Sequence, residues 1–221
     1  MTGFIRANKG FLLFMLLFGV FRTAVADWNP IPSSSMRPSL LEGDVVLVNR
    51  LAYQVKLPLT DVVVARTGEP RRGDVVTFSS PHDGTRLIKR VLALPGERVE
   101  MRNERLLING VESTYSLEAV VREPADGMTM DALRMVEAID GRSHRIQLLP
   151  QRAVARDFGP VTVPPDGFLV LGDNRDNSAD SRIIGFVPRH LLIGRAEGIL
   201  VSADYQGDWM PRFERFGISL R

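Results

Sequence analysis

Three consecutive hydroxyl side chains, Ser33 to Ser35, occur in the segment IPSSSMRPSLLEGD of residues 31–44. A serine hydroxyl becomes a nucleophile when a neighbouring base removes its proton. Pro32 and Pro38 fix their own φ angles and restrict the residues before them, so this segment is stiffer than an ordinary serine-rich stretch. Taken alone, it is equally typical of a short polar linker, and the base must come from elsewhere in the chain.

A lysine in an apolar strand could supply that base. Residues 86–97 read RLIKRVLALPGE, which predicts a strand that runs into a Pro-Gly turn, and alternation places Lys89 on the same face as Leu87 and Val91. Desolvation disfavours the ammonium, and lowering its pKa from ~10.4 to about 7 costs on the order of 4 to 5 kcal/mol. The neutral amine could then act as a general base. The alternative interpretation is a surface lysine on an edge strand.

Lysine is rare in this chain. Of 28 basic residues only Lys9, Lys56 and Lys89 are lysine, so the other 25 are arginine. A guanidinium stays protonated in proteins, whereas a buried amine can lose its proton. A lysine at an apolar position therefore indicates proton transfer.

A dense polar segment, LGDNRDNSADSR at residues 171–182, follows a predicted strand. Its short side chains favour a network in which Asp180 and Arg182 form an ion pair and the Ser178 hydroxyl is free to donate to an amine. A calcium loop is the alternative, but counted from Asn174 the sixth position is alanine and the twelfth is glycine, which does not fit the required pattern.

Other chemistries have less support. The chain has no cysteine, which excludes disulfides, thiolate zinc sites and a cysteine nucleophile. A net charge of +2 gives little reason to expect nucleic acid as a partner. No catalytic triad or metal-ligand pattern surrounds any histidine, so we expect neither a metal nor another cofactor; the histidines are His82, His144 and His190.

The N-terminal residues 1–27 predict a membrane segment. Arg6 and Lys9 precede an apolar run from Gly10 to Phe21, and small residues lead to Ala26. A cleavable signal peptide and a permanent anchor both fit, and the apolar length is marginal for an anchor. The charge of Arg22 favours the anchor, because cleavage sites require small neutral residues and an arginine can snorkel to the headgroups. Both interpretations export the rest of the chain.

After Asp27 the sequence predicts a mainly β fold. Short candidate strands alternate with turns, and Asn109-Gly110 is typical of a tight hairpin. The signals weaken over residues 111–165, which we interpret as an inserted β-rich subdomain within a catalytic domain of residues 28–110 and 166–221. The candidate strands are 44–48, 61–65, 74–78, 86–93, 98–101, 106–109, 167–171 and 197–202.

Taken in order, four segments resemble the bacterial type I signal peptidases, or leader peptidases, which are membrane-bound Ser-Lys proteases. The segments are PSSSMRPSLLEGD, RRGDVVTF, LIKRVLALPGE and GDNRDNSADSRIIGFVP. The resemblance implies a β catalytic domain with an inserted β-rich domain and one N-terminal membrane helix. It also implies a place in the inner membrane, a catalytic domain on the outer, periplasmic side, and signal peptides of exported preproteins and membrane lipid as partners.

By position, the resemblance implies that Ser35 is the nucleophile and Lys89 the general base. The Ser33 hydroxyl would join the backbone N–H of Ser35 in an oxyanion hole, Ser178 would orient the lysine amine, and Asp180 with Arg182 would brace the loop. The sequence departs from the usual family pattern at Ser39, Leu87 and Ile183-Ile184. These departures concern packing and pocket shape and leave the catalytic positions intact.

Two other functions remain open from the sequence. One is a Ser-Lys peptidase with a single dedicated substrate, or a self-cleaving one. The other is an anchored β-domain that binds exported peptides without cutting them. Neither substrate preference nor the role of residues 111–165 follows from the sequence.

Overall fold

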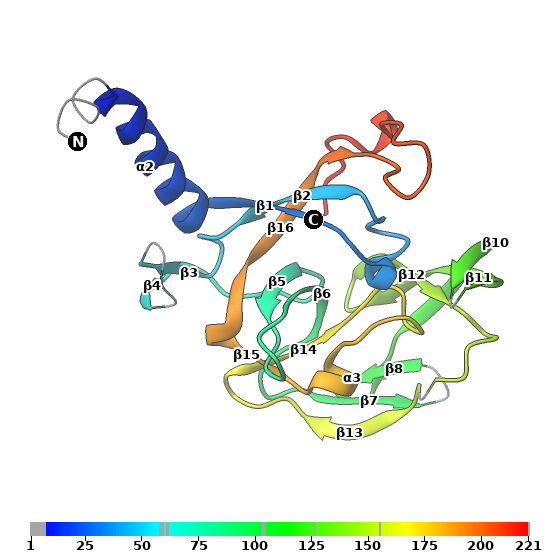
Figure 1. Ribbon diagram of the computed structural model, residues 1–221. Helices are drawn as coiled ribbons and strands as arrows, with labels where there is room; N and C mark the ends of the chain where they lie inside the picture. The colour runs from blue at the N-terminus through cyan, green and yellow to red at the C-terminus, as the bar shows by residue number, and fades with distance from the viewer. Residues whose placement is uncertain are drawn as a thin grey trace.

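The computed structural model of the 221-residue chain describes residues 8–57, 60, 62–102, 105–125, 127–154 and 156–220. One helix projects from a body built almost entirely of β-strands (Figure 1). The mainly β organisation predicted from the sequence is therefore confirmed. Apart from that helix, the helical elements are short: α3 Ser181–Ile184, and the 3-10 turns η1 Ser34–Met36, η2 Arg189–Leu191 and η3 Phe213–Arg215.

The largest sheet has seven strands in the order β1-β2-β16-β5-β6-β14-β15, and all neighbours are antiparallel. β6 and β14 have the predicted bounds, whereas β16 begins at Leu192 rather than at Glu197. The strands are β1 Ala26–Pro30, β2 Asp44–Asn49, β5 Val75–Ser79, β6 Arg86–Ala93, β14 Gly167–Leu171, β15 Val187–Pro188 and β16 Leu192–Ser202.

β6 lies between β5 and β14 and is covered on both faces. Val91 packs into one apolar cluster with Phe78 and Phe168, while Leu92 and Ala93 belong to another. The predicted alternation therefore does not separate a buried face from an exposed one. A strand inside a sheet that is packed on both sides buries side chains of both parities.

Residues 111–165 contribute to two sheets. β10, β11 and β12 form a three-stranded sheet, whereas β9 and β13 extend β7 and β8 in the order β13-β7-β8-β9. The division into a catalytic domain and an insertion stays a prediction. The strands are β7 Arg98–Arg102, β8 Arg105–Ile108, β9 Val111–Glu112, β10 Thr114–Ala125, β11 Met128–Ile139, β12 Arg142–Leu148 and β13 Phe158–Thr162.

Two local predictions concern hairpins. β8 and β9 pair through Ile108 and Val111, with Asn109 and Gly110 between them at φ angles of 54° and 82°. Positive φ at both central residues is what a type I′ turn requires, so the predicted Asn-Gly hairpin is confirmed. β4 Val63–Arg66 pairs with β3 Gln54–Lys56. β4 overlaps the predicted strand 61–65 over residues 63–65, and Asp61 lies outside the described residues.

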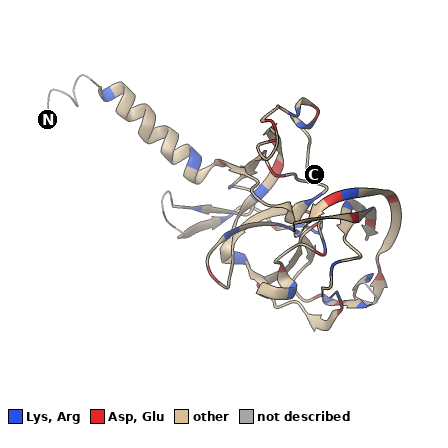
Figure 2. Cartoon of the chain, turned by 45° about the vertical axis from the view of Figure 1, so that its right-hand side comes forward, with Lys and Arg blue, Asp and Glu red and all other residues tan. Residues whose placement is uncertain are grey.

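The helix α2 Lys9–Ala24 occupies most of the predicted membrane segment, and none of its residues is buried. Figure 2 shows it uncharged between basic residues at its two ends, Lys9 and Arg22. Its 16 residues span about 24 Å at 1.5 Å per residue. Within the described residues, no helix combines the length and the hydropathy needed to cross a membrane. Arg6 of the predicted segment lies outside the described residues.

A buried carboxylate joins this helix to the body. Asp27 on β1 accepts from Arg22 of α2 at 3.2 Å and from Arg86 of β6 at 3.1 Å, and Arg50 lies 3.6 Å away. Arg22 also lies over the ring of Trp28. The end of α2 is therefore held to two strands of the main sheet.

A second buried ion pair joins the three-stranded sheet to the loop that follows β14. Glu137 of β11 and Arg175 of the loop are both buried, and Arg175 Nη1 donates to Glu137 Oε1 at 2.8 Å. Tyr115 of β10 and His144 of β12 also contact this carboxylate. Burial raises the pKa of Glu137, but the charge and hydrogen bonds of Arg175, together with His144, outweigh it. The net shift is therefore downward, and the carboxylate stays ionised.

We expect Glu137→Gln to destabilise the fold by about 3 to 5 kcal/mol, because it leaves the Arg175 guanidinium buried without its counter-charge. The matched control is Glu118→Gln, which removes one partner of the solvent-exposed pair with Arg145 and should cost no more than about 1 kcal/mol. Urea unfolding of both variants measures the difference. Equal losses in the two would contradict the structural importance of the buried pair.

Candidate active site

Ser35 lies in the 3-10 turn η1, which two buried apolar side chains fasten to the body. Met36 and Leu40 have no exposed surface and pack into a cluster with Val46 and Val48 of β2. Arg37 pairs with Glu42 at 2.8 Å and also with Glu123 of β10. The serine-rich segment is therefore a fixed part of the fold, and the linker interpretation is wrong.

The structure brings Ser35 and Lys89 together. Lys89 Nζ lies 2.7 Å from Ser35 Oγ and donates at 2.9 Å to the carbonyl oxygen of Ile88. Only 2% of the Lys89 surface is exposed, which excludes the interpretation as a surface lysine on an edge strand. A serine hydroxyl and an amine separated by 54 positions thus form a direct hydrogen bond.

Burial lowers the pKa of the Lys89 amine from 10.5 to about 8, while the carboxylates of Asp180 and Asp173 raise it. The net shift is downward because burial outweighs the two carboxylates, whose negative charge favours the ammonium. With a pKa of about 8, roughly a tenth of the amine is neutral at pH 7.

Arg90, the neighbour of the lysine, supplies the charge that balances one of these carboxylates. Its guanidinium contacts both oxygens of Asp173, at 2.9 and 2.7 Å, and both side chains are buried. Burial raises the pKa of Asp173, but the charge and hydrogen bond of Arg90, together with His144 and Ser39, outweigh it, so the net shift is downward. The predicted alternation places Arg90 on the face opposite Lys89, and the Arg90–Asp173 ion pair was not predicted from the sequence.

A cleft of about 370 Å³ opens beside the Ser35–Lys89 pair. The Ser33 hydroxyl lies 3.4 Å from Ser35 Oγ and is exposed at the cleft. The cleft is lined by residues 32–35 of the serine segment, residues 85–89 at the start of β6, and Asn177 and Ala179 of the polar loop. A peptide bound in this cleft would contact Ser33, Ser35 and Lys89 together.

The predicted ion pair of the polar loop is confirmed. Arg182 contacts both carboxylate oxygens of Asp180, at 2.8 and 2.7 Å, and Asp180 is fully buried. Asp180 also caps α3 by accepting from the backbone N–H of Arg182, and it accepts from the N–H of Gly172 at 3.0 Å. One carboxylate therefore fixes both ends of the loop.

Ser178 is close to the pair but does not make the predicted contact. Its Oγ is buried and has no hydrogen-bond partner among the described residues, and the Lys89 amine donates to Ser35 and to the carbonyl of Ile88. A Cβ on Gly172 would meet Ser178 Oγ at 2.2 Å and the Ser35 carbonyl oxygen at 2.5 Å. Only glycine lets these two groups approach the strand end so closely.

Two asparagines of the same loop, for which the sequence predicted no role, contact the serine segment. Asn174 donates from its backbone to the carbonyl of Ser35 at 3.1 Å and from its side chain to the carbonyl of Ser34 at 3.1 Å. Asn177 donates to the hydroxyl of Ser34 at 2.8 Å. The density of asparagine in the loop was the available signal, but the partners are about 140 positions away in the sequence.

A serine hydroxyl held against a buried amine, beside an open cleft, defines a class of hydrolases that act through an activated nucleophile. Comparison with known proteins narrows the class. Residues 4–201 match the profile described as signal peptidase, peptidase S26. The chain therefore belongs to this family, which makes it a serine endopeptidase that removes signal peptides from preproteins.

Individual relatives agree. Signal peptidase I of Pseudomonas fluorescens is 33% identical over 225 residues, covering 96% of this chain and 78% of the relative. Signal peptidase I of Leptolyngbya laminosa is 34% identical over 192 residues, covering 82% and 71%. A crystal structure of a signal peptidase I from Enterococcus faecalis V583 is 29% identical and covers 57% of this chain and 96% of that one, with a TM-score of 0.34.

Proposed function

We propose that Ser35 is the nucleophile and Lys89 the general base of this endopeptidase. The observation that carries the proposal is the 2.7 Å hydrogen bond between Lys89 Nζ and Ser35 Oγ, formed by an amine that burial makes easier to deprotonate. A base must be within hydrogen-bond distance of the proton that it removes, and its pKa should be close to the working pH. Both conditions are met.

The reaction would proceed by acyl transfer. The neutral amine of Lys89 takes the proton from Ser35 Oγ as the oxygen attacks the scissile carbonyl carbon, and the resulting oxyanion accepts from the Ser33 hydroxyl and the backbone N–H of Ser35. The ammonium then protonates the leaving amine, and the peptide bond breaks. Water, deprotonated by the same amine, hydrolyses the acyl-enzyme and releases Ser35.

Three residues of the polar loop belong to the same proposal as supports. The Asp180–Arg182 pair fixes the loop at the end of β14, and the Asp180 carboxylate favours the ammonium form that the proton transfer creates. Ser178 would accept a hydrogen bond from Lys89 when the amine turns from Ser35 toward the leaving group. Its buried hydroxyl without a partner supports this role.

The substrates in this proposal are exported preproteins that carry small residues before the cleaved bond. The cleft lies along the first residues of β6, where Leu87 and Ile88 line it. The proposed domain division assigns residues 28–110 and 166–221 to this catalytic unit and residues 111–165 to an insertion.

We also propose that the N-terminal segment 1–27, of which α2 is the described helix, attaches the enzyme to the inner membrane by a single pass, with the catalytic domain on the outer, periplasmic side. The exposed side chains of α2 are almost all apolar, and Lys9 at its start would stay on the cytoplasmic side. Attachment places the cleft where the apolar parts of signal peptides are already embedded, which raises their effective concentration.

An apolar surface on the body supports membrane contact. Trp209, Met210 and Phe213 are each more than 60% exposed, and beside them lies an apolar groove of about 560 Å³ that also includes Val201 and Phe216. In Figures 1 and 2 this C-terminal segment and α2 both lie on the upper side of the body. Patches of this kind mark interaction surfaces.

The direct test is cleavage of a purified preprotein by the enzyme and by Ser35→Ala and Lys89→Arg. We expect both substitutions to abolish cleavage, because the first removes the attacking oxygen and the second replaces an amine that can lose its proton with a guanidinium that cannot. A serine-directed phosphonate should label the wild type and not Ser35→Ala. Wild-type turnover by Lys89→Arg would disprove the assignment, and labelling without cleavage of several unrelated preproteins would favour a dedicated substrate.

The pKa of Lys89 predicts the pH dependence. The amine is the active form, so kcat/KM should rise with pH through an apparent pKa of about 8 and level off above it. Initial rates between pH 6 and pH 10 on a short preprotein-derived peptide measure this limb. A rate that does not change, or that falls, between pH 7 and pH 9 would contradict a neutral lysine as the base.

We expect Ser33→Ala to lower kcat by about 10²- to 10³-fold, as the loss of a single oxyanion donor does in other hydrolases. Because the Ser33 side chain is exposed, the substitution should leave the unfolding midpoint unchanged. Ser33→Thr, which keeps the hydroxyl, is the matched control. An increase in KM with an unchanged kcat would show that Ser33 contacts the substrate rather than the oxyanion.

A further inference from the structure

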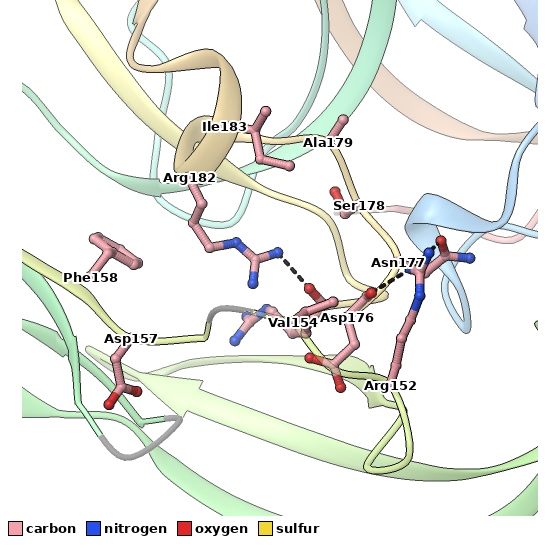
Figure 3. A pocket seen from close by; sticks show the side chains of 11 residues that line it. Arg152, Val154, Asp157, Phe158, Asp176, Asn177, Ser178, Ala179, Arg182 and Ile183 are labelled. Atoms are coloured by element: carbon pink, nitrogen blue, oxygen red, sulfur yellow. Dashed lines mark hydrogen bonds between the residues drawn. The ribbon is translucent and has the colours of Figure 1, made fainter. Parts of the chain in front are cut away.

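In addition to the packing of Met36 and Leu40, hydrogen bonds join the turn that carries Ser35 to the polar loop. Asn174 and Asn177 together donate three hydrogen bonds to Ser34 and Ser35, of which two go to backbone carbonyls and one to the Ser34 hydroxyl. On its other side the loop faces a pocket of about 440 Å³ (Figure 3). A loop with open space behind it can shift unless polar contacts fix it.

Arg152 lines this pocket, and its guanidinium ends at the loop. Its Nη1 donates to the Asn177 Oδ1 atom at 2.6 Å and to the backbone carbonyl of Asp176 at 2.5 Å. Figure 3 shows the Arg152 side chain rising to Asn177, where its guanidinium meets the amide. Arg152 follows β12, so this contact comes from the segment that the sequence left without a role.

The arginine also fixes which way the asparagine amide faces. A guanidinium only donates hydrogen bonds, so the amide oxygen of Asn177 must face Arg152, and its NH₂ group must face Ser34. The Ser34 hydroxyl therefore accepts from Asn177 at 2.8 Å. Arg152, Asn177 and Ser34 form a polar chain that ends one residue before Ser35.

We propose that Asn177, oriented by Arg152, is a positioning residue for the nucleophile that acts through the hydroxyl of Ser34. It holds the 3-10 turn so that Ser35 Oγ stays within hydrogen-bond distance of Lys89, and the sequence argument assigned no role to any of the three residues. The proposal rests on the proposed role of Ser35. It predicts that loss of the Asn177–Ser34 bond slows the chemical step more than it weakens substrate binding.

The test measures kcat, KM and the unfolding midpoint for Asn177→Ala, Ser34→Ala and the double variant, on the full chain with a preprotein-derived peptide. Each single substitution should lower kcat roughly tenfold, the effect of one lost hydrogen bond, with KM within about twofold of wild type. The double variant should be no slower than either single variant, because both remove the same bond. Losses that multiply in the double variant, or a wild-type kcat in Asn177→Ala, would overturn the proposal.

A conservative variant separates positioning from general damage to the fold. Asn177→Asp can still accept from Arg152, and the Ser34 hydroxyl can donate to the new carboxylate, so kcat measured above the pH limb should return to within about threefold of wild type. The pH limb should move upward, because a carboxylate in the cleft favours the ammonium of Lys89. A variant as slow as Asn177→Ala at every pH would contradict the proposed link to Ser34.

Arg152→Met tests the origin of the chain, and Arg145→Met is its matched control because Arg145 pairs with Glu118 at the exposed surface. We expect the first to lower kcat severalfold and the second to leave it unchanged. Equal kcat in the two would disprove the orienting role of Arg152. Ser35→Ala in the same assay reports on the proposed function itself: if it still cleaves, the nucleophile is wrongly assigned, whereas if it is inactive the outcomes above bear on Asn177 alone.

Discussion

The structure depends on keeping one amine dry while holding it next to a hydroxyl. A buried lysine favours its neutral form, and the cost of taking the ammonium out of water must be offset by the rest of the fold. For Lys89 the offset comes from β6 itself, which is packed on both faces, and from the Ile88 carbonyl that accepts from the amine. The carboxylates of Asp173 and Asp180 then limit how far the pKa falls, and each is balanced by its own arginine.

The same balance explains why the segment over residues 111–165 matters to the site. Glu137 pairs with Arg175, Arg37 pairs with Glu123, and Gln147 of β12 exchanges backbone hydrogen bonds with the loop at Asp173 and Arg175. The three-stranded sheet therefore contacts both the nucleophile segment and the polar loop. These contacts are charged or polar, and breaking one of them leaves a buried group without its partner.

Sequence patterns predicted the parts of the fold where local rules and tertiary packing agree. β6, β14 and the Asn109-Gly110 turn are where the residues indicated, and Lys89 was singled out because a lysine interrupts an apolar face. β10 and β11 were missed: most of β10 is exposed, and β11 mixes exposed, half-buried and buried positions without a single period-two pattern. Asn177 and the burial of Arg90 could not be predicted, since hydrogen bonds and ion pairs between distant segments leave no periodic signal in either segment.

The junction at Asp27 has a geometric consequence. This single carboxylate contacts Arg22 near the end of α2 and Arg86 at the edge of the cleft, so the helix and the strand that carries Lys89 share one ionic contact. In the proposed membrane-attached enzyme, this contact relates the position of the Ser35–Lys89 pair to the end of the helix. A signal peptide embedded in that membrane would have to extend far enough from it for its scissile bond to meet Ser35. The distance between the membrane surface and the cleft would therefore help to determine which peptide bond is cut.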